Sequence, residues 1–104
     1  MDRENLRSVL TDILEYVDLF TCGRLANKGQ LLVNVASRAS FLWLSVEQES
    51  ITDSLAVSIV NTLSELFEEV VGAADRGGSA GVMQSARTFN AAIRDSIKQL
   101  DAVL

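Results

Sequence analysis

Histidine and proline are both absent from this chain of 104 residues, and cysteine occurs once, at Cys22. Without histidine, the chain lacks the commonest general base and the usual imidazole ligand of metal ions. With a single cysteine, it has no intramolecular disulfide and no ligand set for a zinc site of the Cys/His type. These absences predict a protein of a reducing compartment that is not an enzyme and holds no metal or cofactor.

Long apolar runs and basic residues are also scarce. No uncharged apolar run reaches about 18 residues, the length that spans a bilayer, and the first residues, MDRENLRSVL, carry charges where a secretory signal needs an apolar stretch. Nine Lys and Arg against 14 Asp and Glu give a net charge of −5. The lack of a long apolar run predicts no membrane span. Because nucleic acids and anionic membranes are polyanions, we also expect no direct nucleic-acid binding and no general adhesion to an anionic membrane. The predicted location is the cytoplasm, or the host-cell cytoplasm if the protein is viral.

Apolar residues, by contrast, are plentiful. They make up 48% of the chain, and the mean hydropathy of +0.22 is high for a soluble monomer of this size. A chain of this length fits one domain, residues 1–104, with a core of its own. The surplus of apolar residues predicts that part of the surface is covered by a partner.

The six glycines lie in two short segments, residues 21–30 and 72–81, which are the natural breaks of the chain. Elsewhere apolar residues recur at spacings of three and four, and sustained alternation of apolar and polar residues is absent. The pattern predicts an all-α protein, an antiparallel four-helix bundle with helices at about 2–20, 27–48, 51–74 and 79–103.

The first and last predicted helices each carry one apolar stripe. The stripe of the first helix, which we expect to end at Gly23, consists of Leu6, Leu10, Ile13, Val17 and Phe20. The last helix has a seam with nearly heptad spacing, made of Val82, Ala86, Phe89, Ile93, Ile97, Leu100 and Leu104. Both helices are therefore predicted to lie against the core along one side.

The segment between the glycine-rich breaks holds either two helices or one kinked helix. Its first half carries an apolar stripe of Leu32, Val35, Ala39, Leu42 and Val46. The stripe fails at Glu49 and Asp53, and Ser50 followed by acidic Asp53 is typical of an N-cap with an acidic N3 residue. A second stripe then follows, made of Leu55, Ile59, Leu63, Leu66 and Val70. We predict two helices with a turn at residues 48–52.

Residues 39–50, ASFLWLSVEQES, contain the only tryptophan. With about 100° of rotation per helical residue, Leu42 falls on the core stripe and Trp43 at its edge, so we predict that both belong to the core. Phe41 and Leu44 project from the opposite side of the same helix. The helix therefore has a second, narrower apolar stripe.

This second stripe includes Val33, and Ser37, Ser40 and Ser45 lie around its apolar members. One interpretation is that the helix is central in the bundle and packed on both sides. The other is that four residues form a self-association or docking interface: Val33, Ser37, Phe41 and Leu44. Aromatic side chains ringed by small polar ones are typical of interface centres.

The predicted third helix carries three glutamates on its polar face, Glu65, Glu68 and Glu69. The ordinary interpretation is a solvated helix face with a few weak ion pairs. The alternative is an acidic face that steers the domain toward a basic partner.

Three functional hypotheses follow, and none of them involves catalysis. The first is a small protein–protein interaction module in a regulatory, adaptor or assembly role, self-associating as a homodimer. The second is an acidic inhibitor that masks a basic surface of a partner protein, of a viral or phage type. The third is a bundle that opens to bind lipid or another apolar ligand, although acidic faces and few lysines disfavour a membrane surface.

Overall fold

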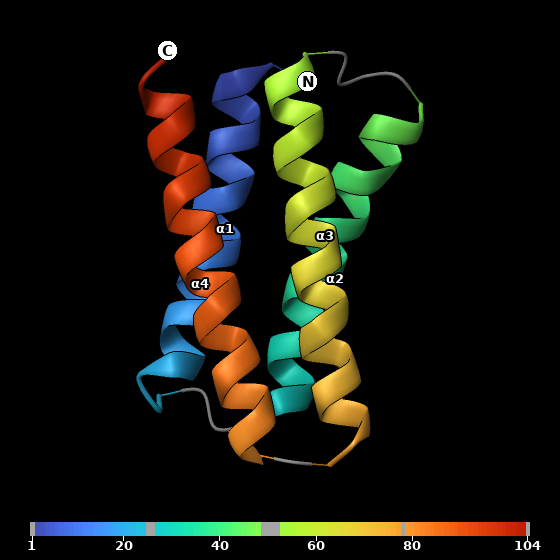
Figure 1. Cartoon of the computed structure of the whole chain (residues 1–104), viewed down its shortest axis with the longest axis vertical. Helices are drawn as coiled ribbons and strands as arrows, with labels where there is room; N and C mark the ends of the chain where they lie inside the picture. Colours follow the sequence, from blue (N-terminus) through green and yellow to red (C-terminus); the bar gives the residue numbers. More distant parts are fainter. Residues whose placement is uncertain (1, 25–26, 49–52, 78, 104) are drawn as a thin grey trace.

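Four helices make up the fold in this computed structural model, which describes residues 2–24, 27–48, 53–77 and 79–103. They are α1 (Arg3–Thr21), α2 (Lys28–Glu47), α3 (Ser54–Asp75) and α4 (Ser79–Asp101). Successive helices run in opposite directions, and each packs against its neighbours in the sequence, with α4 closing the ring against α1 (Figure 1). The predicted antiparallel four-helix bundle is confirmed, and α2 and α3 are two helices rather than one kinked helix.

The ends of α1 follow from local sequence. The side chain of Asp2 accepts a hydrogen bond from the backbone N–H of Asn5 at 2.8 Å, which caps the first turn. At the other end Gly23 has a φ of 82°, a conformation that glycine adopts at little cost. The N–H of Gly23 bonds to the carbonyl of Phe20, and that of Arg24 to the carbonyl of Leu19, the two bonds of a Schellman motif.

The start of α3 differs from the prediction. Its N-cap is Asp53, whose carboxylate accepts a hydrogen bond from the N–H of Ala56 at 3.2 Å. The expected N-cap, Ser50, lies outside the described residues. Asp53 takes the cap position because a carboxylate serves a helix N-terminus well and because it also meets Arg3 of α1, which donates to it at 2.8 and 3.0 Å.

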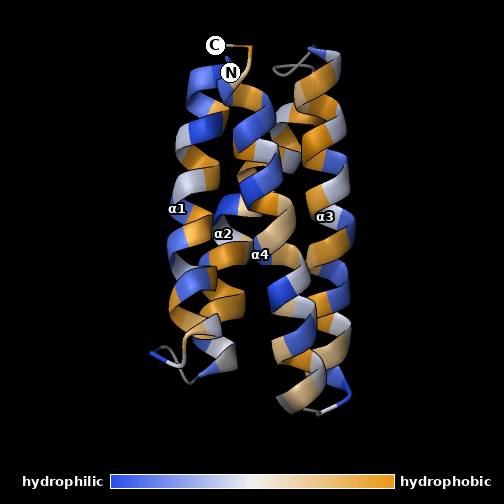
Figure 2. Cartoon of the chain, turned by 60° about the vertical axis from the view of Figure 1, so that its left-hand side comes forward, coloured by the Kyte–Doolittle hydropathy of each residue, from blue (hydrophilic) through white to orange (hydrophobic). Residues whose placement is uncertain are grey.

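The buried side chains of all four helices form one core cluster. Every member of the predicted α1 stripe is buried: Leu6, Leu10, Ile13, Val17 and Phe20. In α4, Val82, Ala86, Phe89, Ile93 and Leu100 are buried and Ile97 is partly buried, while Leu104 lies outside the described residues. Figure 2 accordingly shows hydrophilic colour along the outer side of α1. Each fully buried large apolar side chain contributes roughly 1.5–3 kcal/mol to stability.

The core face of α2 is rotated slightly from the predicted one. Leu31, Val35 and Leu42 are buried, whereas Leu32 and Val46 of the predicted stripe are only partly buried. Residues 31, 35 and 42 fall within about 40° of one another on a helix, so the bundle uses this narrower face.

Ser45 is a further difference on α2. It was expected beside Phe41 and Leu44 on the outer stripe, but it is buried, with 7% of its surface exposed. Its hydroxyl donates to the backbone carbonyl of Phe41 at 2.9 Å, which satisfies the polar group within the helix itself. The boundary between the core face and the exposed face of α2 therefore runs between Ser45 and Phe41.

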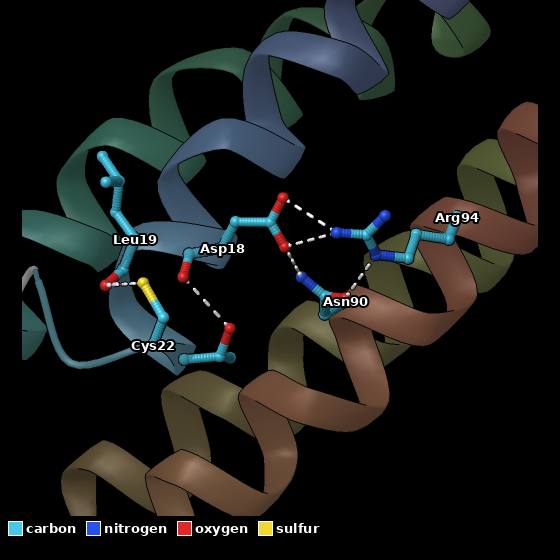
Figure 3. A network of polar contacts seen from close by, with 6 residues as sticks. Asp18, Leu19, Cys22, Asn90 and Arg94 are labelled. Carbon is cyan, nitrogen blue, oxygen red and sulfur yellow. Dashed lines mark hydrogen bonds and ion pairs between the residues drawn. The ribbon is translucent and has the colours of Figure 1, made fainter.

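Ion pairs join α1 to α3 and to α4. Besides the contact between Arg3 and Asp53, Arg7 pairs with Asp101, and Arg94 donates to both carboxylate oxygens of Asp18 at 2.8 and 3.0 Å. Figure 3 shows this last contact, in which the amide of Asn90 also donates to Asp18 at 2.6 Å. No ion pair of the described residues involves α2.

Candidate functional site

The outward side of α2 holds most of the exposed large apolar side chains. Four of the six such side chains in the described ranges belong to α2: Val33 (67% exposed), Phe41 (55%), Leu44 (48%) and Trp43 (47%). Val33, Phe41 and Leu44 fall within about 80° of one another around the helix, so they form a patch, whereas Trp43 lies about 100° away from Leu44. Patches of this kind mark interaction sites more often than isolated apolar residues do.

The predicted interface residues all lie on this outward side. Val33, Ser37, Phe41 and Leu44 are exposed, and the Ser37 hydroxyl donates to the carbonyl of Val33 at 3.0 Å. Because the Ser37 hydroxyl is hydrogen-bonded within its own helix, Ser37 needs no polar partner at an interface. The interpretation in which α2 is packed on both sides within its own bundle is therefore wrong, and the role of these residues in an interface stays a prediction.

Trp43, like Ser45, does not lie where the sequence pattern predicts. It was predicted to be core, but 47% of its surface is exposed, whereas its neighbour Leu42 is buried as predicted. One residue along a helix is a rotation of about 100°, which carries Trp43 from the core face to the edge of α2. There it borders an open space between α2 and α3 rather than filling the core.

This space is a groove, which we call the α2–α3 groove. Its volume is about 490 Å³, and it is lined by Ala39, Ser40, Trp43 and Leu44 of α2 and by Ser64, Phe67 and Glu68 of α3. The small side chains Ala39, Ser40 and Ser64 leave the room that Trp43 and Phe67 border. The volume lies in the range of ordinary ligand-binding sites. Toward its C-terminal end α2 also diverges from α3 (Figure 1).

A small void lies beneath the groove. Its volume is about 10 Å³, and Ala39 and Ser64 line it together with core residues such as Leu42 and Phe89. It offers room for no more than about one water molecule. The groove therefore has a closed floor, and any ligand of it would bind at the surface.

The acidic residues predicted on the third helix meet this groove at one point. Glu65, Glu68 and Glu69 are all exposed on α3, and Glu68 lines the groove whereas the other two do not. None of the three forms an ion pair with another described residue. The structure thus brings together Leu44 and Glu68, which the sequence had placed in two separate candidate surfaces.

The groups with shifted pKa values lie elsewhere. The hydrogen bonds that Arg3 donates hold the pKa of Asp53 below its usual value, and those of Arg7 do the same for Asp101. Both shifts are explained by ion pairs that join the helices, so they do not indicate an acid–base centre. Within the described ranges, no group of three or more Cys, Asp or Glu side chains is placed to hold a metal ion.

A second hollow lies at the C-terminal end of α1. It has a volume of about 520 Å³ and is lined by Glu15, Tyr16, Asp18, Leu19, Cys22 and Arg24. Two of its polar side chains have partners: Asp18 binds Arg94, and the Cys22 thiol donates to the carbonyl of Leu19 at 3.6 Å (Figure 3). The α2–α3 groove, where the exposed apolar side chains of Trp43 and Leu44 stand next to Phe67, is the stronger candidate.

Comparisons with known proteins add no assignment: the chain matches no protein-family model, no curated protein and no solved structure. Among the helices of the described ranges, none combines the length and the apolar character that crossing a membrane requires.

Proposed function

We propose that this chain is a small non-enzymatic protein–protein interaction module, in a regulatory, adaptor or assembly role, that self-associates as a homodimer through the outward side of α2. The observation that carries the proposal is the pair of half-exposed side chains Phe41 and Leu44, with Val33 two to three turns away on the same side of the helix. Covering apolar surface releases roughly 25 cal/mol per Å². Aromatic residues next to small serines also fit the composition of interface centres.

The spacing of the outward residues supports a pairing of α2 with α2 of a second copy. Val33, Ser37, Ser40 and Leu44 follow one another at intervals of four, three and four, the spacing of a coiled-coil seam. In an antiparallel pair with a two-fold axis between residues 40 and 41, Leu44 faces Ser37 of the partner copy. Phe41 then faces Ser40 of the partner copy, and each large side chain enters the space left by a small one.

The test is light scattering coupled to size-exclusion chromatography over a wide range of protein concentration. We expect a dimer for the wild type and a monomer for the double variant Phe41→Ser and Leu44→Ser. Because both side chains are half-exposed, the helical circular dichroism of the variant should be unchanged. Val103→Ser is the matched control, since Val103 is also 48% exposed but lies outside α2, and it should leave the dimer intact.

Two results would contradict self-association through α2. One is a wild type that stays monomeric at the highest concentration reached. The other is a double variant that loses its helical signal cooperatively, because Phe41 and Leu44 would then belong to the core. An apolar seam should hold nearly equally at low and high salt, since salt screens only charges.

A second candidate function is the acidic inhibitor that masks a basic surface of a partner protein. It is supported by the exposed and unpaired carboxylates Glu65, Glu68 and Glu69 on α3. Binding of this kind weakens steeply with salt, which distinguishes it from apolar self-association. The third hypothesis, an apolar-ligand carrier, requires the bundle to open, because the void inside it has only about 10 Å³.

A further inference from the structure

We propose that the α2–α3 groove is a docking site for a basic amphipathic helix of another protein. The proposal rests on the proposed role of the chain in protein–protein interaction, but not on its self-association. The two surfaces overlap at Ser40 and Leu44, but Val33, Ser37 and Phe41 belong to the self-association seam alone, and Trp43, Phe67 and Glu68 belong to the groove alone.

The walls of the groove offer apolar contact to a helix. Trp43 and Leu44 line it from α2 and Phe67 from α3, and these two antiparallel helices form a trough rather than an enclosed cavity. The ring of Phe67 packs against that of buried Phe89, with centroids 5.8 Å apart, so the core holds this wall of the groove in place. A trough with aromatic walls suits the helix-in-groove mode, in which residues at i, i+3, i+4 and i+7 provide the anchors.

Charge decides which kind of helix fits. Glu68 lines the groove and has no ion pair with a described residue. The one arginine of α2 is occupied, since Arg38 donates to the carbonyl of Asn34 at 2.9 Å and lies over the ring of Tyr16 at 4.7 Å. A cationic side chain on an incoming helix would therefore meet a carboxylate without displacing a partner. With a net charge of −5, the whole chain also favours the approach of a basic helix.

A second copy of this chain does not provide such a helix. The basic residues of α4, Arg87, Arg94 and Lys98, are exposed, but the large apolar side chains of α4 are buried or partly buried in its own bundle. On α2 the situation is reversed, because exposed apolar side chains stand beside acidic Glu47 rather than beside a free arginine. No described helix surface combines apolar and free basic side chains, so the occupant is a helix of another protein.

The experiment uses the full chain and a synthetic peptide of about 18 residues, or about five helical turns, with leucines along one face and lysines elsewhere. Trp43 is the only tryptophan and lines the groove, so its fluorescence reports directly on the site. Binding of a peptide without tryptophan should shift the Trp43 emission to shorter wavelength. It should also protect Trp43 from a soluble quencher, because the exposed half of the indole becomes covered.

Two control peptides test the two parts of the recognition. A peptide of the same composition with leucines scrambled around the helix keeps the charge but loses the apolar face, and we expect it not to bind. A peptide with glutamate in place of every lysine keeps the apolar face but reverses the charge, and we expect the same. If the glutamate peptide binds as well as the lysine peptide, the groove does not select a basic partner and the proposal is wrong.

Protein variants test the location, with fluorescence anisotropy of a labelled peptide as the readout. We expect Trp43→Ala and Glu68→Lys each to lower the affinity for the lysine peptide about tenfold. Asp12→Lys is the matched control for charge, because exposed Asp12 lies on α1, and Val103→Ala is the control for an exposed apolar residue. Each control should change the affinity less than about twofold. An equal loss for Glu68→Lys and Asp12→Lys would reduce the binding to general electrostatic attraction and overturn the proposal.

The experiments can contradict the groove proposal and the self-association proposal independently of each other. Because Ser40 and Leu44 belong to both surfaces, peptide binding is measured at a protein concentration at which the chain is monomeric. No binding of the lysine peptide there, together with a dimer at higher concentration that depends on Phe41 and Leu44, would overturn the groove proposal and leave the proposed homodimer standing. A chain that is always monomeric but binds the peptide with a shift of the Trp43 emission would support the groove and contradict self-association.

Discussion

The two sides of this bundle differ in how far their apolar side chains are buried and their charges paired. On the side of α1 and α4, large apolar side chains are mostly buried, and exposed charges pair across the helices, as Asp18 does with Arg94. On the side of α2, Phe41 and Leu44 are half-exposed, and no ion pair of the described residues reaches the helix. The first side is explained by the chain's own packing. The second leaves large apolar side chains in water, and it is the surface on which the proposed interactions rest.

The difference arises from how many faces of each helix are apolar. A helix in a four-helix bundle buries roughly one face. The apolar residues of α1 lie mainly on a single stripe, so burial uses most of them. Those of α2 extend round the helix, from buried Leu42 to exposed Val33 on the opposite side, so burial of one face leaves the other in water. We therefore expect mutations on the two sides to act on different properties.

The largest expected effect is a loss of stability on the side of α1 and α4. Leu10→Ala removes a side chain that is 0% exposed in α1 and should destabilise the fold by about 2–5 kcal/mol. Leu44→Ala, the same substitution at a half-exposed position of α2, should cost less than about 1 kcal/mol in the monomer. Chemical denaturation of both variants, at a protein concentration below dimer formation, checks the contrast. Equal losses would mean that α2 contributes to the core as much as α1 does.

This contrast also marks how far the sequence could predict the fold. The stripes of α1 and α4 were predictable because each has one apolar face, and a single face leaves one way to orient the helix. The separation of α2 from α3 was predictable because Glu49 and Asp53 interrupt the apolar stripe. The cap was misplaced because Ser50 and Asp53 are both good N-cap residues, and the contact of Asp53 with Arg3, 50 residues away, is not visible in local sequence.

The candidate site was only partly predictable for the same reason. On a helix with two apolar faces, small changes of rotation decide which residues are exposed, and this is how Trp43 and Ser45 were both misplaced. The groove depends on small residues from two helices, Ala39 and Ser64, lining the same space. Such a juxtaposition depends on how α2 packs against α3, which the sequence of neither helix determines alone. A weak signal was present in Phe67, an aromatic residue directly before Glu68.

A smaller effect is expected at Asp53, where α1 meets the start of α3. Asp53→Ala removes both the helix cap and the ion pair with Arg3, whereas Asp53→Asn keeps a good capping side chain and removes only the charge. We expect Asp53→Ala to lower the midpoint of thermal unfolding by a few degrees and Asp53→Asn to lower it less. If the two variants unfold at the same temperature, the cap contributes nothing beyond the ion pair.

The contribution of Asp53 to stability depends on pH, and the direction of its pKa shift determines how. The hydrogen bonds from Arg3 lower the pKa of Asp53 in the folded protein, so Asp53 adds stability above the ordinary aspartate pKa of about 4. That stability is lost as the pH falls from this value through the lowered pKa, because protonation breaks the ion pair. Asp101, whose pKa Arg7 lowers, acts in the same direction. Thermal unfolding from pH 7 to pH 2 should therefore show a smaller loss for Asp53→Asn than for the wild type.

The smallest effect is expected at the contact of Asp18 with Arg94 and Asn90, although it is the most extensive polar contact between α1 and α4 (Figure 3). Both charged side chains are about half-exposed, 41% for Asp18 and 53% for Arg94, and exposed ion pairs contribute only about 0.2–1 kcal/mol. A double-mutant cycle with Asp18→Ala and Arg94→Ala, measured by denaturation at low and high salt, isolates the interaction. A coupling free energy in this range that falls with salt would mean that α1 and α4 are held together mainly by their buried apolar side chains. A coupling free energy well above this range would mean that polar contacts hold α1 and α4 together. The two sides would then differ in polar contacts as well as in apolar burial, because no ion pair of the described residues reaches α2.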